Sequence, residues 1–454
     1  MYTLSGKLKI TAIILMIVGA IGLIYGFLSA PSSIEDVKEI IASHEAHGEG
    51  HAAAEETTHQ VDGVDAENSK VVAATGEQAS DAHSDEDTHA EHMLHQLQNK
   101  PWAATYVAAF FFFMIALGTL AFYAVQYAAQ AGWSPVLFRV MEAITAYLLP
   151  GSIIMFVLLV LSGVHLNHLF IWMDPEVVAN DSIIQAKESY LNVPFFLIRA
   201  AIYIAGWNIF RFFLRRNSLR HDEVDHNRYY KANFKLSAGF LVFFMVSESM
   251  MSWDWIMSFD PHWFSTLFGW YLFSSLFVAA ITVIALVTMF LKSRGYLPTV
   301  NDSHIHDLAK FMFGMSIFWT YLWFSQFMLI WYSNIPEEVT YYITRIEDYN
   351  LPFFGMVALN FIFPVLMLMN SDYKRINWFV VMTGVIILFG HYLDIYTMVM
   401  PATVGKSWFI GVSEISALLF FGGLFLLIVF SALTKAPLIT KRNPFLKESE
   451  QFHY

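Results

Sequence analysis

The chain contains no cysteine. Without thiols it can form no disulfide, bind no iron–sulfur cluster through thiolates and attach no c-type haem covalently. A part in electron transfer would therefore require a diffusible redox partner, a non-covalent cofactor or a cluster that another subunit holds.

Charged residues are also scarce. They make up 14% of the 454 residues, whereas an average soluble domain has roughly 25%. Hydrophobic residues make up 56%, and apolar runs long enough for a transmembrane helix recur along most of the chain. The composition therefore predicts an all-α integral membrane protein. No Gly-rich nucleotide loop, nucleophile elbow or HExxH pattern supports a hydrolase or an ATPase.

The apolar runs predict about ten transmembrane helices, which places both chain ends on the same side of the membrane. We interpret the first run as a retained anchor, because it is long and Ala30-Pro31 is a poor signal-peptide cleavage site. The predicted spans are Ile10–Leu28, Trp102–Ala129, Val136–Val164, Val193–Leu214, Ser237–Met257, Thr266–Leu291, Leu308–Tyr332, Leu351–Asn370, Trp378–Met398 and Val412–Leu433.

Lysine and arginine are distributed unevenly between the two sets of loops. With the N-terminus in the cytoplasm, nineteen of the 26 fall on the cytoplasmic side, six on the opposite side and Arg199 inside the fourth span. Cytoplasmic loops of membrane proteins are enriched in these residues. The distribution therefore predicts a multi-pass protein with both termini in the cytoplasm.

The acidity of the chain belongs to one segment. Residues 31–100 contain sixteen Asp and Glu against three Lys, a formal charge of −13, so that the rest of the chain contributes about +1 to the total of −12. The segment also holds eight of the seventeen histidines, at irregular spacing. A His-rich tract can bind metal ions, but this spacing and the polar residues between favour a solvated, largely disordered extracytoplasmic loop. We predict no metal site.

Ionisable side chains recur inside the predicted spans. Glu248, His391 and Asp394 lie deepest by the span limits, where charge is costly and usually marks a proton or ion pathway. The pKa values of carboxylates and imidazoles can move toward neutrality in such surroundings. The candidates for a proton path are Glu248, Asp254, His391 and Asp394.

Further polar residues are predicted near the outer ends of the spans, around a Trp-rich turn at 252–271. They can form an outer polar cluster that receives a quinol headgroup, and an interfacial aromatic belt with a capped hairpin is the alternative. The candidates for this cluster are His165, Asp254, Asp260 and His262. At the opposite end Arg139 and Glu142 lie three residues apart, which predicts a structural ion pair.

Two long motifs resemble a known family. WDWIMSFDPHWFSTLFGWY begins at Trp253 and FWTYLWFSQFMLIWYSNIPEE begins at Phe318. They resemble the NrfD/polysulfide-reductase-like membrane proteins, and more narrowly the second such subunit (the ActF type) of bacterial alternative complex III, a quinol:cytochrome c oxidoreductase. The likeness covers most of the chain, including the ten spans and the acidic loop after the first.

The resemblance implies a specific architecture. Helices two to five (101–265) and six to nine (266–400) would form two four-helix bundles. The first helix (1–30) and the last helix with its tail (401–454) would be peripheral. In this family the better-supported quinol site belongs to the sister subunit, where His and Asp lie near the outer face. Here His165 and Asp254 have a comparable depth.

The resemblance also implies partners in a bacterial inner-membrane complex. These are a sister NrfD-like subunit, an iron–sulfur subunit, c-type cytochrome subunits and a terminal oxidase, with the haem and iron–sulfur clusters held by these partners. The complex would oxidise menaquinol or ubiquinol. No nucleic acid is expected as a partner.

The expected function is that of a cofactor-free subunit of a respiratory quinol-oxidising complex, which contributes a proton pathway and a quinol pocket. A ten-helix secondary transporter is the alternative, although paired Gly/Pro-broken helices are not evident at matching positions in the two halves. A b-type cytochrome or haem–copper core would need several facing histidines inside the membrane, and only His391 lies clearly within a predicted span.

Overall fold

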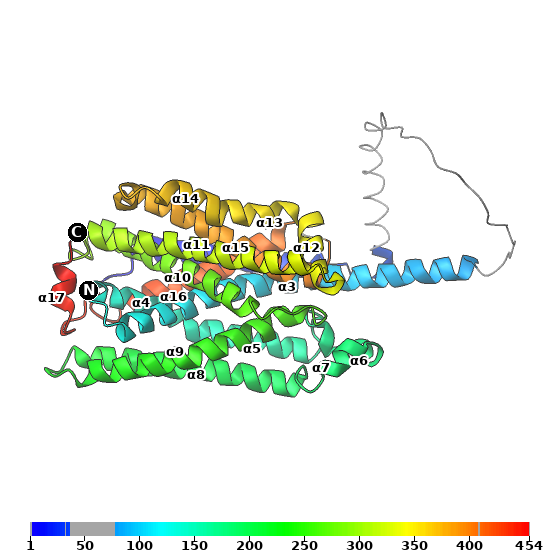
Figure 1. Cartoon of the computed structure of the whole chain (residues 1–454), viewed down its shortest axis with the longest axis horizontal. Coiled ribbons are helices and arrows are strands. Elements are labelled where there is room, and N and C mark those ends of the chain that lie inside the picture. Colours follow the sequence, from blue (N-terminus) through cyan, green and yellow to red (C-terminus); the bar gives the residue numbers. More distant parts are fainter. Residues whose placement is uncertain (1, 32, 37–77, 407–408, 454) are drawn as a thin grey trace, which may run out of the picture.

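The computed structural model describes residues 2–31, 33–36, 78–406 and 409–453, with the backbone alone for 78–92. Within these residues ten helices are long and apolar enough to cross a membrane. Most of them lie side by side along the long axis of the molecule (Figure 1). The predicted all-α fold and the ten apolar helices are therefore confirmed, and the pattern is that of a multi-pass membrane protein.

The helices of the body follow the predicted spans closely. Several begin or end a few residues beyond them, because apolar stretches continue into polar helical turns at the ends. The long helices are α1 (Gly6–Leu28), α3 (Gln78–Ala128), α5 (Leu148–Gly163), α8 (Val193–His221), α9 (Arg228–Trp255), α10 (Phe268–Ser293), α11 (Asp302–Ser333), α15 (Asn377–Val404) and α16 (Val412–Leu433). The eighth span consists of α13 (Asn350–Val357), a π-helical turn (Ala358–Ile362) and α14 (Phe363–Leu368).

Five further α-helices are short, and 3₁₀ turns lie between several of the elements. The first, α4 (Phe138–Ile144), leads into α5 through a 3₁₀ turn. The others lie at the two ends of the body (Figure 1). They are α6 (Pro175–Asn180), α7 (Ser182–Lys187), α12 (Pro336–Glu347) and α17 (Leu446–Glu450).

Helix α3 corrects one prediction. It begins at Gln78, not near Trp102, and continues through Pro101. The prediction of a disordered loop is therefore wrong for residues 78–100, and residues 37–77 lie outside the described residues. The physical reason is that an existing helix can be extended without a new nucleation step. The preceding residues are also rich in Ala, Glu, Gln, Leu and Met, which favour helix.

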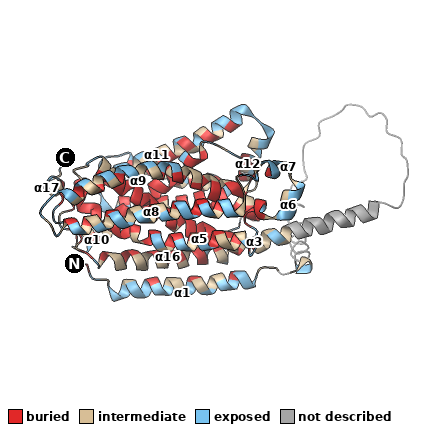
Figure 2. Cartoon of the chain, turned by 90° about the horizontal axis from the view of Figure 1, so that it is seen from below, coloured by how far each residue is buried: buried red, intermediate tan, exposed pale blue. Residues whose placement is uncertain are grey.

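Helices α3 and α10 form the centre of the body. Their apolar windows are 94% and 89% buried, against 28% for α8 and for α11. Helix α3 packs against α5, α9, α10, α15 and α16. It approaches α10 closely at Gly118, where an added Cβ would stand 2.6 Å from the carbonyl oxygen of Leu276. The buried residues of Figure 2 accordingly gather between the helices and not on their outer faces.

Both termini lie at one end of the body, as an even number of spans requires (Figure 1). We call this the inner end, and the end that carries α6, α7 and α12 the outer end, following the predicted orientation. The C-terminal tail folds across the inner end. Asn301 Nδ2 donates to the carbonyl of Phe452 at 2.6 Å, and Ser449 Oγ donates to the carbonyl of Trp133 at 2.6 Å.

Helix α1 lies at the edge of the body and packs mainly on α16 (Figure 2). Small residues allow the close approach. A Cβ at Gly19 would stand 2.5 Å from the backbone nitrogen of Phe420, and Gly22 and Gly26 face the hydroxyls of Ser416 and Ser413. This small-residue packing is typical of helix pairs in membranes, where apolar burial gives little drive for association.

We predict that Gly19→Ala loosens α1 from α16, because the new methyl group would meet backbone atoms that cannot move independently. Overpacking of this kind costs about 1–3 kcal/mol, and the thermal unfolding midpoint of the purified chain in detergent should fall. Gly6→Ala is the control, since no atom lies within 4 Å of a Cβ there. Equal midpoints for the two variants would contradict the prediction.

Candidate functional site

A polar cluster lies among α10, α11 and α15. The Asp394 carboxylate is fully buried. It accepts hydrogen bonds from Ser275 Oγ at 2.7 Å and Trp319 Nε1 at 2.8 Å, and a third from the Tyr271 hydroxyl. No lysine or arginine in the described part of the chain pairs with Asp394. Neutral donors thus satisfy this carboxylate, which would otherwise be very costly to bury.

Helix periodicity brings these side chains together. Tyr271 and Ser275 are four residues apart on α10, and His391 and Asp394 are three apart on α15, so that each pair shares one face of its helix. Helices α10, α11 and α15 pack against one another. The sequence indicated the shared face of His391 and Asp394 but gave no signal for the donors on the other two helices.

His391 is connected to Asp394 through Ser275. Its Nδ1 lies 2.9 Å from Ser275 Oγ and 3.6 Å from Asp394 Oδ2. Ser275 has a single proton and donates it to Asp394, so we assign a proton to His391 Nδ1 that is donated to Ser275. The Nε2 atom is then an acceptor, and it has no hydrogen-bond partner among the described residues. Carboxylate, hydroxyl and imidazole therefore form a hydrogen-bonded chain with one open acceptor.

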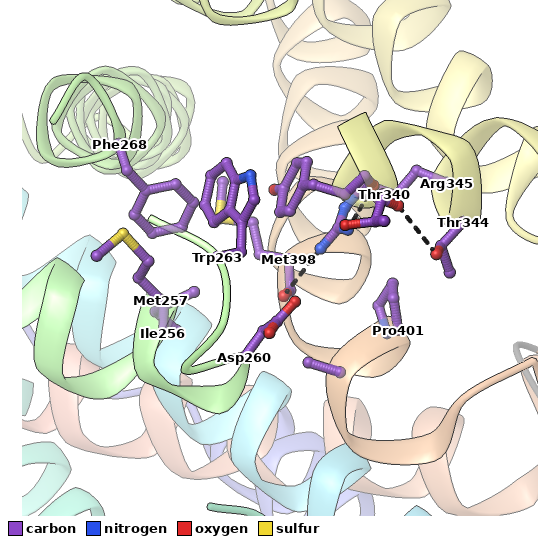
Figure 3. A pocket seen from close by; sticks show the side chains of 12 residues that line it. Ile256, Met257, Asp260, Trp263, Phe268, Thr340, Thr344, Arg345, Met398 and Pro401 are labelled. Atoms are coloured by element: carbon purple, nitrogen blue, oxygen red, sulfur yellow. Dashed lines mark hydrogen bonds between the residues drawn. The ribbon is translucent and has the colours of Figure 1, made fainter. Parts of the chain in front are cut away.

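A cavity of about 90 Å³ opens between the turn after α9 and helices α12 and α15 (Figure 3). Asp260 and Arg345 both line it, together with Trp263 and Tyr341, whose rings stack with centroids 4.0 Å apart. Arg345 is held by the carbonyls of Thr397 at 3.0 Å and Tyr341 at 2.8 Å. Since roughly 10–15 Å³ is enough for one water molecule, the cavity has room for several.

A smaller cavity of about 10 Å³ shares part of its lining with this one. Tyr341 and Arg345 line both cavities, and Tyr271, which donates to Asp394, lines the smaller one. Gln326 also lines it, and its Oε1 has no partner among the described side chains. Polar groups therefore continue from Asp260 near the outer end to His391 in the interior of the helices.

Asp254 has a different environment from Asp394. Arg199 donates to both of its oxygens, from Nε at 2.8 Å and from Nη2 at 2.9 Å, and the Tyr203 hydroxyl lies 3.2 Å away. The guanidinium also stacks on Tyr190, with 3.8 Å to the ring centroid. Burial, together with the negative charge of Asp254, raises the pKa of the Tyr190 phenol to about 12. Asp254 is thus held in a buried ion pair.

Glu248 stands apart from both acids. It is 2% exposed on α9, and its Oε1 has no hydrogen-bond partner in the described part of the chain. No hydrogen bond or ion pair within the described residues links it to Asp254 or Asp394. Of the four residues predicted for a proton path, only His391 and Asp394 are therefore brought together.

The four candidates for the outer cluster are divided among separate places. Asp254 pairs with Arg199 inside the helices. His262 Nε2 lies 2.5 Å from Asp181 Oδ2 on the surface, and its Nδ1 is 3.9 Å from Asp260. His165 lines a third cavity. The prediction of one cluster therefore holds only for Asp260 and His262, because Asp254 is held by Arg199 and His165 lines a separate cavity.

The third cavity, of about 430 Å³, lies at the outer end between α3, the loop after α5 and the end of α15. This volume is within the range of small-molecule sites. Burial, with the nearby His95, lowers the pKa of His168, so that its imidazole is neutral near pH 7. No three His, Asp or Glu side chains of the described residues stand at metal-ligand spacing. The polar lining residues are His95, Gln96, Asn99, His165, Asn167, His168, Asp174, Glu176 and Thr403.

Arg139 and Glu142 form an ion pair at 2.7 Å at the inner end, as predicted. Sequence spacing missed the rest of their network, which joins α3, α4 and α8. Arg139 also reaches Asp222 at 2.5 Å, and Glu142 accepts from the Tyr123 hydroxyl at 2.7 Å and pairs with Arg215. The charges of two cations and two acids neutralise one another here, so we assign the network a structural role.

The three buried polar regions thus differ in chemistry. The Arg199–Asp254 pair and the network around Arg139 are internally neutralised by opposite charges. The Asp394 cluster has neutral donors, an open imidazole nitrogen and cavities on one side, which suits the transfer of protons.

In comparisons with known proteins, no protein-family model and no curated protein matches the chain.

We predict that Asp254→Asn strongly destabilises the chain, because it leaves the buried Arg199 charge without a counter-ion. Removal of one partner of a buried pair costs about 3–5 kcal/mol, whereas replacement of both by apolar residues is often neutral. The double variant Arg199→Met/Asp254→Leu should therefore recover most of the loss in detergent unfolding. Lys292→Met, which removes an exposed pair with Asp302, is the control. A loss no larger than that of the control would contradict the prediction.

We also predict that acid weakens the loop around His168. The lowered pKa of this residue means that the unfolded chain binds more protons than the folded chain as the pH falls through about 6.5, so stability is lost on acidification. The unfolding midpoint should fall between about pH 7.5 and about pH 5.5, and by less in His168→Gln. An identical pH dependence in the two proteins would refute this assignment.

Proposed function

We propose that the chain is a cofactor-free membrane subunit of a respiratory quinol:cytochrome c (electron carrier) oxidoreductase, and that α10, α11 and α15 provide a proton pathway. The observation that carries the proposal is the Asp394 carboxylate, buried without a cation, bonded to three neutral donors and connected to His391 through Ser275. Buried acids and imidazoles in membrane helices are typical of proton relays.

The helix contacts support the two-bundle arrangement that belongs to this proposal. Helix α3 packs on α5 and α9, and α8 packs on α5 and α9, which suits one bundle. Helix α10 packs on α11 and α15, and α14 packs on the same two helices, which suits a second. The proposal places α1 and α16 at the periphery, both termini in the cytoplasm and the chain in a bacterial inner membrane.

A proton can move through the cluster in a defined order. When His391 Nε2 takes up a proton, the Nδ1 proton can pass to Ser275 Oγ, and the Ser275 proton can pass to Asp394. The net result is a neutral Asp394 and an imidazole whose proton now lies on Nε2. Asp394 can then release its proton toward the cavities lined by Tyr271 and Arg345. The reverse order moves a proton inward.

The partners in the proposal would hold the redox centres, since this chain has no cysteine. They are a sister NrfD-like subunit, an iron–sulfur subunit, c-type cytochrome subunits and a terminal oxidase. Menaquinol or ubiquinol would be the substrate. The outer cavity lined by His165 and His168 suits a quinol headgroup, because an imidazole nitrogen can accept a hydrogen bond from one of its hydroxyls. Glu248 stays a candidate for a separate path in the first bundle.

We predict that Asp394→Asn slows proton transfer in the assembled complex by about 100-fold or more, since a positioned acid–base group contributes roughly 10²–10⁴-fold. Complex reconstituted in vesicles is supplied with a quinol, and proton release and electron transfer are recorded together. Asp348→Asn, a change near the surface in the segment after α12, is the control.

Unchanged proton release and unchanged turnover in Asp394→Asn would remove the proton-path claim. The transporter hypothesis has its own signature in the same vesicles. If the chain purified alone moves a solute across them without a redox partner, the assignment to a quinol-oxidising complex is wrong.

A further inference from the structure

The eighth span is interrupted by a π-helical turn, Ala358–Ile362, between α13 and α14. Single π turns inside α-helices are rare and occur frequently at functional sites. Pro364 gives this one a sequence cause. A proline has no N–H to donate to the carbonyl four residues earlier, here that of Asn360, and its ring crowds that carbonyl. The turn therefore widens at Asn360.

The widened turn directs Asn360 into the second bundle. The π turn contacts α15 and α11, the helices that carry Asp394 and Trp319. The Asn360 amide lies against Gly390, where an added Cβ would stand 2.1 Å from Oδ1 and 2.7 Å from Cγ. Any side chain at position 390 would therefore displace the Asn360 amide. The residue that follows Gly390 on α15 is His391.

The Asn360 side chain is 0% exposed, and neither Oδ1 nor Nδ2 has a hydrogen-bond partner in the described part of the chain. A buried amide without partners is costly, and such groups in native proteins usually have a functional reason or bind ordered water. His391 Nε2 is unpartnered in the same way. Unsatisfied polar atoms therefore occur on two neighbouring helices.

More unpartnered hydroxyls lie toward the inner end. Ser316 on α11 and Thr383 on α15 are both 0% exposed, and their hydroxyls have no partner among the described residues. Ser316 is three residues before Trp319, and Thr383 is eight residues before His391, or about 12 Å along the helix axis. The two helices run from the inner to the outer end, so these groups continue the series inward.

We infer that Asn360 is a positioning residue that continues the proton path from His391 into the inner half of the second bundle. Its amide holds water between His391 Nε2 and the hydroxyls of Ser316 and Thr383. An amide suits this task because it both donates and accepts and adds no charge inside the membrane. A held water gives a proton to Nε2 and receives one from the next water. The inference rests on the proposed function.

The test uses the assembled complex in vesicles. Asn360→Leu keeps the approximate size but removes both polar atoms, and it should slow proton uptake from the inner side about tenfold, as expected for the loss of one hydrogen-bonding group. The solvent deuterium isotope effect on turnover should rise. Asn360→Ser retains a hydroxyl and should recover uptake to within about threefold of the unmodified complex. Gly390→Ala, which displaces the amide, should act like Asn360→Leu.

The matched control is Asn233→Leu in the first bundle. Asn233 is 1% exposed and also has an unpartnered Oδ1 in the described structure, so this variant reports the general effect of removing a buried amide. It should leave proton uptake and the isotope effect unchanged. The unfolding midpoint is measured for every variant.

The outcomes separate this inference from the proposed function. If Asp394→Asn blocks uptake and Asn360→Leu does not, the role of Asn360 is overturned and the proton path stands. If neither variant changes uptake, the proposed function itself fails. If Asn360→Leu and Asn360→Ser lose uptake only in proportion to lost stability, with no change in the isotope effect, Asn360 is structural and the inference is overturned.

Discussion

The structure depends on how an apolar helical body accommodates carboxylates. A carboxylate taken out of water must be neutralised, paired or given several hydrogen bonds. The chain uses two of these solutions for Asp254 and Asp394, which are both fully buried. Asp254 is paired with the Arg199 guanidinium through two hydrogen bonds, whereas Asp394 is surrounded by the hydroxyls of Tyr271 and Ser275 and the indole of Trp319.

The two solutions have different functional consequences. A guanidinium has no accessible deprotonated form, so the Arg199–Asp254 pair favours one protonation state and one geometry. Neutral donors impose no such fixed charge, and the hydroxyls around Asp394 can exchange donor and acceptor roles. Tyr271, which donates to this acid, lines a cavity together with Arg345 and Tyr341. The hydrogen bonds among α10, α11 and α15 can therefore rearrange, whereas the Arg199–Asp254 pair is fixed.

Much of the fold could be predicted from the sequence. Apolar runs located ten helices, because the length needed to cross a bilayer is a strong constraint, and helical spacing paired Arg139 with Glu142 and placed His391 beside Asp394. The partners of the buried acids could not be predicted. Asp394 and Ser275 are 119 residues apart, and Asp254 and Arg199 are 55 apart, so their meeting depends on how the helices pack.

Short stretches of the sequence also differ in how well they predict the local structure. The composition of the polar residues before Trp102 predicts a loop, yet α3 begins at Gln78 because an established helix extends readily. Pro364 is a visible cue in the sequence for the π turn. Its effect on Asn360 became clear only from the contact with Gly390.

The most direct test of the central claim is infrared difference spectroscopy of the assembled complex during turnover, with the Asp394 signal assigned by subtracting spectra of Asp394→Asn. The account predicts a carboxyl band from Asp394 that appears and decays with turnover and shifts in deuterated water. The Asp254 carboxylate should remain silent. A silent Asp394 carboxylate throughout turnover, with proton release intact, would contradict the account.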